Sequence, residues 1–170
     1  GTDGWYWCSV YHYSDNSIMG FSHTHLSGTG CGDYGNVLIM PMNGELRTIP
    51  GSKERPEEGY RSRFSHEHEH AEPGYYSVIL EDYGIRAELT ATEHCGLHRY
   101  TFPGGEGYVI IDLAHRIRGK AVEESIKIVN NTTVEGYTRC DQSGGGWCAS
   151  GARYTVYFSA EFSKPFDSCP

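Results

Sequence analysis

The chain has 170 residues and a formal net charge of −8, with 14 lysine and arginine side chains against 22 acidic ones. This balance argues against nucleic acid as a partner, because phosphate binding needs clustered basic side chains. There is no run of about 18 or more apolar residues and no basic segment followed by an apolar stretch at the start, so we expect neither a membrane span nor a signal peptide. The 22 glycines and 13 tyrosines favour strands and turns over helices.

Short segments of alternating or apolar residues predict strands throughout the chain. In chain order the predicted strands cover residues 36–42, 75–81, 85–93, 97–103, 108–115, 124–132 and 153–162. The charged segment 48–60, which contains proline and glycine, is expected to be a surface loop. No amphipathic helix and no internal repeat is recognisable. The sequence therefore predicts an all-β fold, an antiparallel β-sandwich with few or no helices, in a single domain over residues 1–170.

The clearest predicted strand covers residues 85–93 and forms a hairpin with the strand before it. Asp82, Tyr83 and Gly84 supply the turn between them. Four apolar residues are expected on one face and four polar residues on the other: Ile85, Ala87, Leu89 and Ala91 against Arg86, Glu88, Thr90 and Thr92. In the last predicted strand five residues share a face: Tyr154, Val156, Phe158, Ala160 and Phe162.

Six cysteines are scattered along the chain without a CxxC pair, which argues against a zinc ribbon or a thioredoxin-like site. They are Cys8, Cys31, Cys95, Cys140, Cys148 and Cys169. Cys140 and Cys148 flank a glycine-rich turn, where they either form a disulfide in an oxidising compartment or remain free thiols.

The segment HEHEH at residues 66–70 formally matches the metalloprotease pattern HExxH. That pattern binds zinc only on a helix, and here Pro73 and Gly74 follow at once. On a strand, His66, His68 and His70 would line one face. We expect a solvated, histidine-rich edge with no functional metal.

Several separate motifs carry a family resemblance. The stretch GFSHTHLSGTGCGDYGNVLIMP follows YHYSD, and the segments FSHEHEHAEPGYYSVILEDYGIRAELTATEHCGLHRYTFP, VIIDLAH and YFSAEFSKPF come after it. In this order they resemble the N-terminal domain of glycoside hydrolase family 92, over nearly all of the chain. The resemblance implies a supersandwich-like, galactose-mutarotase-like β-sandwich and an (α/α)6 catalytic domain after Pro170.

The resemblance also implies the activity of the parent protein. Family 92 enzymes are exo-acting, inverting, calcium-dependent α-mannosidases, so we expect hydrolysis of N-glycan-type mannosides, with α-1,2 bonds as the expected target, and a secreted, periplasmic or cell-surface location in a bacterium. The expected partners are a mannose-containing glycan and the protein's own catalytic domain. Calcium is expected to be bound mainly by that absent domain and not by this chain. None of the 22 acidic residues lies in a motif that carries a catalytic role, so the chain alone is expected to be inactive.

Three residues are candidates for substrate binding. Trp5 matches a family tryptophan before YHYSD, and it either stacks on a mannose ring or packs as a core or interface aromatic. His23 and His25 alternate, so an extended segment would present both on one face, where they either reach the interdomain cleft or hold the glycine-rich loop by hydrogen bonds. Asp33 and Tyr34 are expected to form a turn.

A rival hypothesis is a freestanding carbohydrate-binding module. The same aromatic residues and the lack of recognisable catalytic groups support it. A fragment that has lost its partner domain should expose a large apolar patch, whereas a binding module should show one aromatic groove on a polar surface.

Overall fold

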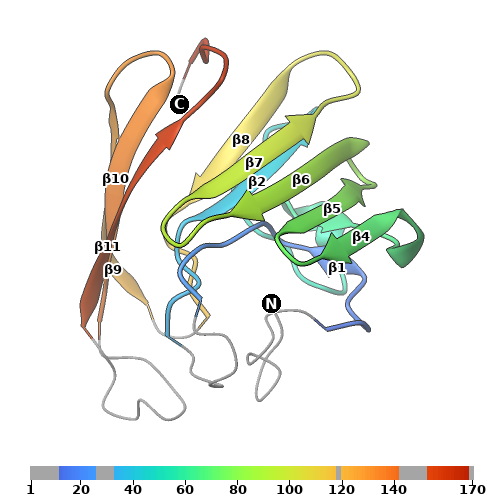
Figure 1. Ribbon diagram of the computed structural model, residues 1–170, viewed down its shortest axis with the longest axis horizontal. Coiled ribbons are helices and arrows are strands. Elements are labelled where there is room, and N and C mark those ends of the chain that lie inside the picture. The colour runs from blue at the N-terminus through green and yellow to red at the C-terminus, as the bar shows by residue number, and fades with distance from the viewer. Residues whose placement is uncertain (1–11, 26–32, 118–119, 142–152, 169–170) are drawn as a thin grey trace. The chain divides into compact units, whose positions relative to one another are not determined.

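The computed structural model describes residues 12–25, 33–117, 120–141 and 153–168. These residues fall into two compact units. The first unit takes its described residues from Tyr11–Phe21 and Ile39–Ile111, and the second takes them from Ser22–Leu38 and Asp112–Pro170. Almost all regular structure is β (Figure 1). Within the described part of the chain, no helix has the length and apolar character that crossing a membrane requires.

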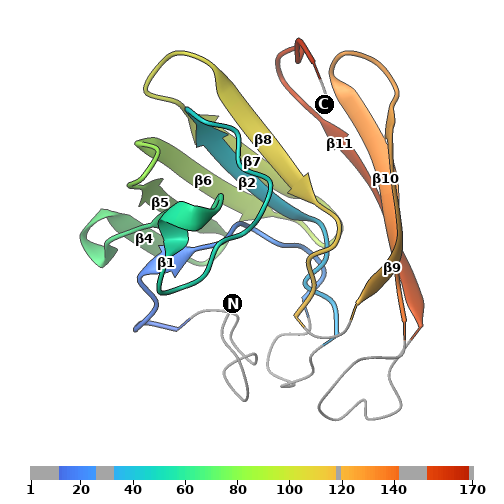
Figure 2. The same cartoon turned by 180° about the vertical axis from the view of Figure 1, so that it is seen from behind.

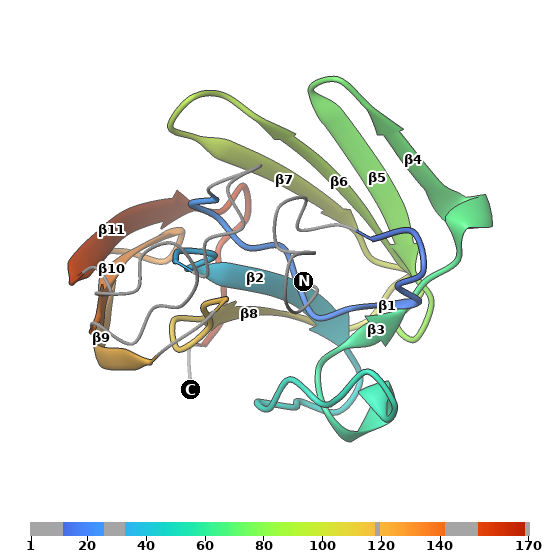
Figure 3. The ribbon, with the colours of Figure 1, turned by 90° about the horizontal axis from the view of Figure 1, so that it is seen from below.

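The first unit contains a four-stranded antiparallel sheet in the order β4-β5-β6-β7. Its strands are β4 (Glu69–Glu72), β5 (Tyr75–Leu80), β6 (Ile85–Ala91) and β7 (Gly96–Thr101). Two further pairs join β2 (Leu38–Asn43) to β8 (Gly107–Asp112), and β1 (Ser17–Ile18) to β3 (Ser62–Arg63). The four-stranded sheet lies opposite β2 and β8 (Figure 3).

The core of the first unit consists of apolar side chains from both layers. Those exposing no more than 8% of their surface are Met40, Met42, Tyr60, Phe64, Val78, Leu80, Ile85 and Ala87. Burying an aliphatic side chain of this size stabilises the fold by about 1.5–3 kcal/mol. The alternation of strand residues and this shared core make the unit a sandwich, so the predicted all-β, antiparallel β-sandwich with few helices is confirmed.

The predicted hairpin is also confirmed. Leu80 pairs with Ile85, and Gly84 in the turn adopts φ +62°, a conformation that glycine adopts without steric cost. Of the four apolar residues expected on one face of β6, Ile85 and Ala87 are buried and Leu89 is half-buried, but Ala91 is exposed near the strand end.

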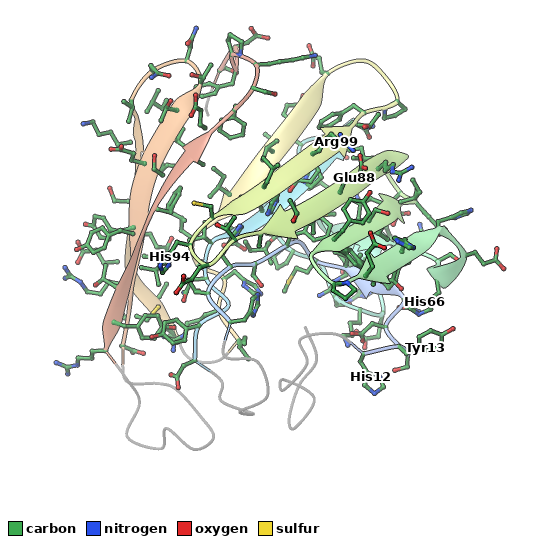
Figure 4. The ribbon with its side chains drawn as sticks, viewed as in Figure 1. His12, Tyr13, His66, Glu88, His94 and Arg99 are labelled. Carbon is green, nitrogen blue, oxygen red and sulfur yellow. The ribbon has the colours of Figure 1, made fainter. Side chains whose placement is uncertain are left out.

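Glu88 differs from expectation, because it lies on the polar face of β6 and is nevertheless buried. Tyr75 Oη donates a hydrogen bond of 2.7 Å to it, and the Arg99 guanidinium donates two of 2.6 and 2.8 Å (Figure 4). These cross-strand neighbours cover the carboxylate. Hydrogen bonds from Arg99 and then Tyr75 lower the pKa of Glu88 to about 2.

The second unit contains a three-stranded antiparallel sheet in the order β11-β10-β9 (Figure 2). The strands are β9 (Ala121–Ile128), β10 (Thr133–Cys140) and β11 (Tyr154–Glu161). The predicted alternation of the last strand is largely confirmed: the five predicted face-sharing residues are half-buried and Tyr157, Ser159 and Glu161 are exposed, although Thr155 is half-buried as well. Val134 and Thr138 on β10 are buried.

The loop at residues 48–60 is largely exposed, as predicted, and contains one short 3-10 helix, η2 (Pro56–Glu58). Its last residue departs from the prediction, because Tyr60 is fully buried. The peptide N–H of Tyr60 donates to the Ile49 carbonyl at 2.8 Å, which closes the loop onto itself.

The histidine-rich segment is not one continuous strand. Residues His66–His68 form a 3-10 helix, η3, and only His70 lies in β4. The Ser65 hydroxyl accepts a hydrogen bond of 3.2 Å from the Glu67 N–H, which caps this helix. The expectation that three histidines line one strand face is therefore wrong for His66 and His68.

Candidate functional site

Two stretches of the second unit, residues 22–25 and 33–38, are joined by backbone hydrogen bonds and include the predicted site histidines. The His23 N–H donates to the Asn36 carbonyl at 2.9 Å, and the Gly35 N–H donates to the Thr24 carbonyl at 3.0 Å. This ladder brings the SHTH and GDYGN parts of the sequence together. We refer to these two stretches as the paired segment.

The backbone of the paired segment is strained. Among the described residues, the non-glycine positions with positive φ are Thr24 at 58°, Tyr34 at 68° and Val37 at 52°, and all three lie here. Such conformations cost on the order of 1–3 kcal/mol each, and β-branched Thr24 and Val37 adopt them least readily. Strain of this kind persists only where surrounding contacts impose it, and it concentrates at functional sites.

His23 is held by the paired segment itself. Its Nδ1 lies 2.7 Å from the Val37 carbonyl oxygen. Because a carbonyl only accepts, Nδ1 must carry the hydrogen. His23 therefore fixes the position of the second stretch relative to the first.

His25 combines a fixed donor with an unsatisfied acceptor. Its Nε2 lies 2.9 Å from the Ser22 carbonyl oxygen, so Nε2 carries the hydrogen. Burial lowers the pKa of His25, and the neutral ring leaves a lone pair on Nδ1. This Nδ1 is buried and has no hydrogen-bond partner among the described residues. It is an acceptor suited to a hydroxyl group or a water molecule.

The loop after β8 adds a third histidine to the site. His115 Nδ1 donates to the Gly35 carbonyl at 2.7 Å, and burial lowers the pKa of His115. Asn36 is fully buried, and its side-chain amide lies 3.5 Å from the His115 carbonyl and 3.4 Å from Cys140 Sγ. Cys140 is a buried free cysteine in the structure. Its predicted partner Cys148 lies outside the described residues.

A buried ion pair lies in the same unit. Arg116 Nη2 is 3.9 Å from Asp33 Oδ1, and the two side chains expose 1% and 3% of their surface. Neither carboxylate oxygen of Asp33 is hydrogen-bonded within the described residues, nor are Nε and Nη2 of Arg116. Buried charges without hydrogen bonds are costly unless water or a ligand supplies the partners.

Tyr34 and Tyr154 connect the paired segment to β11. The Tyr34 N–H donates to Tyr154 Oη at 2.9 Å, the two rings lie 4.6 Å apart, and the Arg116 guanidinium lies 5.4 Å from the Tyr154 ring. Burial raises the pKa of Tyr154. A pocket of about 570 Å³ adjoins this ring. Its lining residues are Val122, Arg139, Cys140, Asp141, Arg153, Tyr154 and Thr155.

This arrangement suits the binding of an uncharged ligand that carries polar groups. It offers neutral imidazoles, an amide and an open acceptor on His25, which are groups that hydrogen-bond to hydroxyls. The buried carboxylate of Asp33 is paired with Arg116, which does not suit it to act as a free acid or base in the hydrolysis of a glycosidic bond.

The sequence-predicted residues have different outcomes. His23 and His25 lie together in the paired segment, where both contact its backbone. Asp33 is buried beside Arg116, and Tyr34 adopts the left-handed conformation typical of a turn. Trp5 lies outside the described residues.

The histidines of the histidine-rich segment lie close to carboxylate or carbonyl oxygens of the chain. His66 contacts Glu69 and the Tyr13 carbonyl, while His68 and His70 lie 3.5 Å from Glu81 and Glu72 respectively. Across residues 12–25, 33–117, 120–141 and 153–168 there is no cluster of three or more His, Cys, Asp or Glu side chains that could hold a metal ion.

The sequence did not point to Asn36 or Arg116 as members of the site. Each is buried and polar, and each belongs to a segment that looked like ordinary strand or loop. His115 lies within VIIDLAH, a motif that carried the family resemblance, but its type and spacing gave no specific role. Only tertiary packing brings these residues into one cluster.

Residues 1–169 match the glycosyl hydrolase family 92 N-terminal domain. Over 92 residues the chain is 35% identical to an uncharacterized secreted glycosidase of Arthroderma benhamiae, covering 52% of this chain and 11% of that protein.

Solved structures give a closer likeness. The family GH92 α-mannosidase BT3965 from Bacteroides thetaiotaomicron in complex with mannoimidazole is similar at 40% identity and a TM-score of 0.85, covering 94% of this chain. A second structure of the same enzyme gives a TM-score of 0.84. The chain spans 20% and 21% of the length of these two structures.

Proposed function

Because the chain belongs to glycoside hydrolase family 92, we propose that it is the N-terminal β-sandwich domain of an exo-acting, inverting α-mannosidase. The observation that carries this proposal is the 40% identity to an α-mannosidase over 94% of the chain. The proposed substrates are N-glycan-type mannosides, with α-1,2 bonds as the target. Since the chain spans only a fifth of that relative, hydrolysis is an activity of the larger protein.

The proposed role of this domain is to contact the sugar. Mannose presents hydroxyl groups, and the lone pair of His25 Nδ1 would accept a hydrogen bond from one of them. His23 lies in the same segment and is the second proposed contact. Trp5 is the third, as a ring on which the sugar stacks.

The catalytic acid and base are proposed to lie outside this chain. Inverting hydrolysis uses two carboxyl groups about 6.5–9.5 Å apart, one to protonate the leaving oxygen and one to activate water. Asp33 is unsuited to either role, because it is buried next to Arg116. The domain would instead bind and orient the mannoside.

Calcium, which the family implies, takes six to eight oxygen ligands. The described residues do not fit such a site, since they contain no cluster of metal-binding side chains. The proposal therefore assigns calcium to the larger protein and gives the metal no role in this domain.

The parent enzyme is proposed to act outside the cell. The matched glycosidase of Arthroderma benhamiae, which is described as secreted, supports this location. In that setting the protein's own catalytic domain and a mannose-containing glycan are its proposed partners.

An assay on two proteins tests the proposed function. The intact enzyme, incubated with α-1,2-mannobiose and calcium, should release mannose that appears first as the β anomer in the NMR spectrum, because inversion converts α to β. The 170-residue chain alone should give no turnover above a buffer blank. Release of the α anomer, or turnover by the isolated chain, would contradict the proposal.

A further inference from the structure

Tyr13 in the first unit is a largely exposed aromatic ring that is nevertheless fixed in place. It exposes 73% of its surface, yet its ring stacks on His66 with centroids 4.2 Å apart and planes 7° from parallel (Figure 4). Phe64 packs edge-on against His66 at 5.2 Å. Because His66 covers one face of the Tyr13 ring, the exposure of the residue implies that the opposite face is open to solvent.

His66 is itself held at both ring nitrogens. Nδ1 lies 2.5 Å from Glu69 Oε2, and Nε2 lies 2.6 Å from the Tyr13 carbonyl oxygen. Glu69 exposes only 7% of its side chain and accepts a further hydrogen bond of 2.6 Å from Tyr76 Oη. A carboxylate and a carbonyl are both acceptors, so this geometry is satisfied by an imidazolium that carries hydrogen on both nitrogens. Tyr13 is thus fixed through its ring and its backbone.

We propose that the open face of Tyr13, backed by His66, is a binding platform for a pyranose ring, built from none of the residues of the paired segment. One face of a pyranose presents C–H bonds, whose positive hydrogens pack against the negative face of an aromatic ring. An ordinary exposed tyrosine loses rotamer freedom when a ligand immobilises it, and this loss weakens binding. Tyr13 has already lost that freedom in the folded chain.

The choice of mannose as the ligand rests on the proposed function, whereas the platform itself rests on the geometry of Tyr13 and His66. A monosaccharide stacked on one ring buries little surface, so we expect a dissociation constant on the order of 1 mM. Such a platform would add affinity for an outer residue of a branched glycan by tethering it close to the enzyme.

Tyr157 on β11 provides a matched control. It exposes 74% of its surface, almost the same fraction as Tyr13. Its aromatic neighbour, Tyr137, is tilted by 48° at a centroid distance of 5.7 Å rather than stacked in parallel. Any general tendency of sugars to contact exposed tyrosines should affect both residues equally.

Titration of the full chain with methyl α-D-mannopyranoside, followed by NMR, tests the platform. Saturable shifts of the Tyr13 ring signals are expected in the wild type, Tyr157→Ala and His25→Gln proteins. Tyr13→Ala should bind at least about tenfold more weakly, while Tyr13→Phe should retain binding because it keeps the ring. Unchanged affinity in Tyr13→Ala, or equal shifts at Tyr157, would overturn the inference.

The pH dependence of binding separates a fixed ring from a merely exposed one. The hydrogen bond to Glu69 and then that to the Tyr13 carbonyl raise the pKa of His66 above its ordinary value of 6.5. The imidazolium contacts are therefore complete below about pH 6.5 and are lost as the pH rises through the raised pKa. Mannoside affinity should fall over that range in the wild type, and Glu69→Gln should move the fall to lower pH. A pH-independent affinity would contradict the role of His66.

The choice of sugar distinguishes this inference from the proposed function. The same titration with methyl β-D-galactopyranoside should give weaker binding at Tyr13. If the galactoside bound Tyr13 more tightly than the mannoside did, the platform would stand and the assignment of mannose would fail.

Discussion

The two units differ in how many of their buried polar atoms lack hydrogen bonds and in where their strained backbone lies. The described non-glycine residues with positive φ all lie in the second unit. Buried side-chain atoms without a hydrogen-bond partner belong to His25, Asp33, Asn36, Arg116 and Thr138 in the second unit, and in the described part of the first unit only to Arg61. The first unit instead buries apolar side chains between regular strands. The first unit is therefore stabilised mainly by apolar packing, whereas the second unit keeps strained backbone and unsatisfied polar groups of the kind that concentrate at functional sites.

The largest expected effect follows from breaking the buried ion pair of the second unit. Arg116→Met should lower the free energy of unfolding by about 3–5 kcal/mol, because it leaves the Asp33 carboxylate buried without its counter-charge. The double variant Asp33→Asn/Arg116→Met should recover much of that loss. Urea denaturation measures both. A double variant as unstable as Arg116→Met would show that the two charges do not interact.

A core truncation in the first unit should cost about 2–5 kcal/mol of unfolding free energy. Leu80 is fully buried beside the hairpin turn, and Leu80→Ala leaves a cavity that its neighbours fill only in part. Leu97→Ala on β7 is the control, since Leu97 is 67% exposed and should change stability by less than about 0.5 kcal/mol. Equal denaturation midpoints for the two variants would contradict the assigned core.

Alanine substitutions at two glycines, one in each unit, allow the backbone strain of the two units to be compared. Gly35 and Gly44 have nearly the same φ, +77° and +75°, but a Cβ on Gly35 would lie 2.8 Å from Ile117 Cγ1, whereas nothing lies within 4 Å at Gly44. Either change to alanine should cost about 1–2 kcal/mol for the left-handed backbone. Gly35→Ala should cost more through crowding, and thermal denaturation should rank the two. A larger loss at Gly44 would contradict the close packing of the paired segment.

The smallest expected effect is the pH dependence from Glu88. Its folded pKa of about 2 lies below the ordinary 4.5, so its contribution to stability is present above pH 4.5 and is lost as the pH falls toward 2. Glu88→Gln should therefore lower the melting temperature at pH 6 and differ less from the wild type at pH 2. A gap between the two proteins that stays constant across this range would contradict the depressed pKa.

Much of the fold was predictable because strands leave a period of two in the sequence. The alternation in residues 85–93 and 153–162 located β6 and β11 directly. Strand β10 was missed, since Gly136 and charged residues interrupt its pattern. The structure explains that glycine: a Cβ there would lie 2.3 Å from the Ser125 carbonyl oxygen and 2.8 Å from the Phe158 ring.

The site was predictable only in part. The SHTH and GDYGN segments were recognisable through the family resemblance, and they do lie side by side. The remaining members come from residues distant in sequence, such as Arg116 and Cys140, whose roles follow from burial rather than from any local pattern. Glu88 illustrates the same limit in the first unit, because its burial depends on Arg99 and Tyr75 across neighbouring strands.

The central claim is that the paired segment contacts the mannoside, and the most direct test is the kinetics of the intact enzyme with His25→Gln. The account predicts a loss of kcat/KM of about tenfold or more, since the acceptor at Nδ1 would be displaced, with the denaturation midpoint little changed. His94→Gln, in an exposed turn of the first unit, should leave kcat/KM unaltered. Unaltered kcat/KM in His25→Gln together with a lowered midpoint would show that His25 serves only to hold the loop.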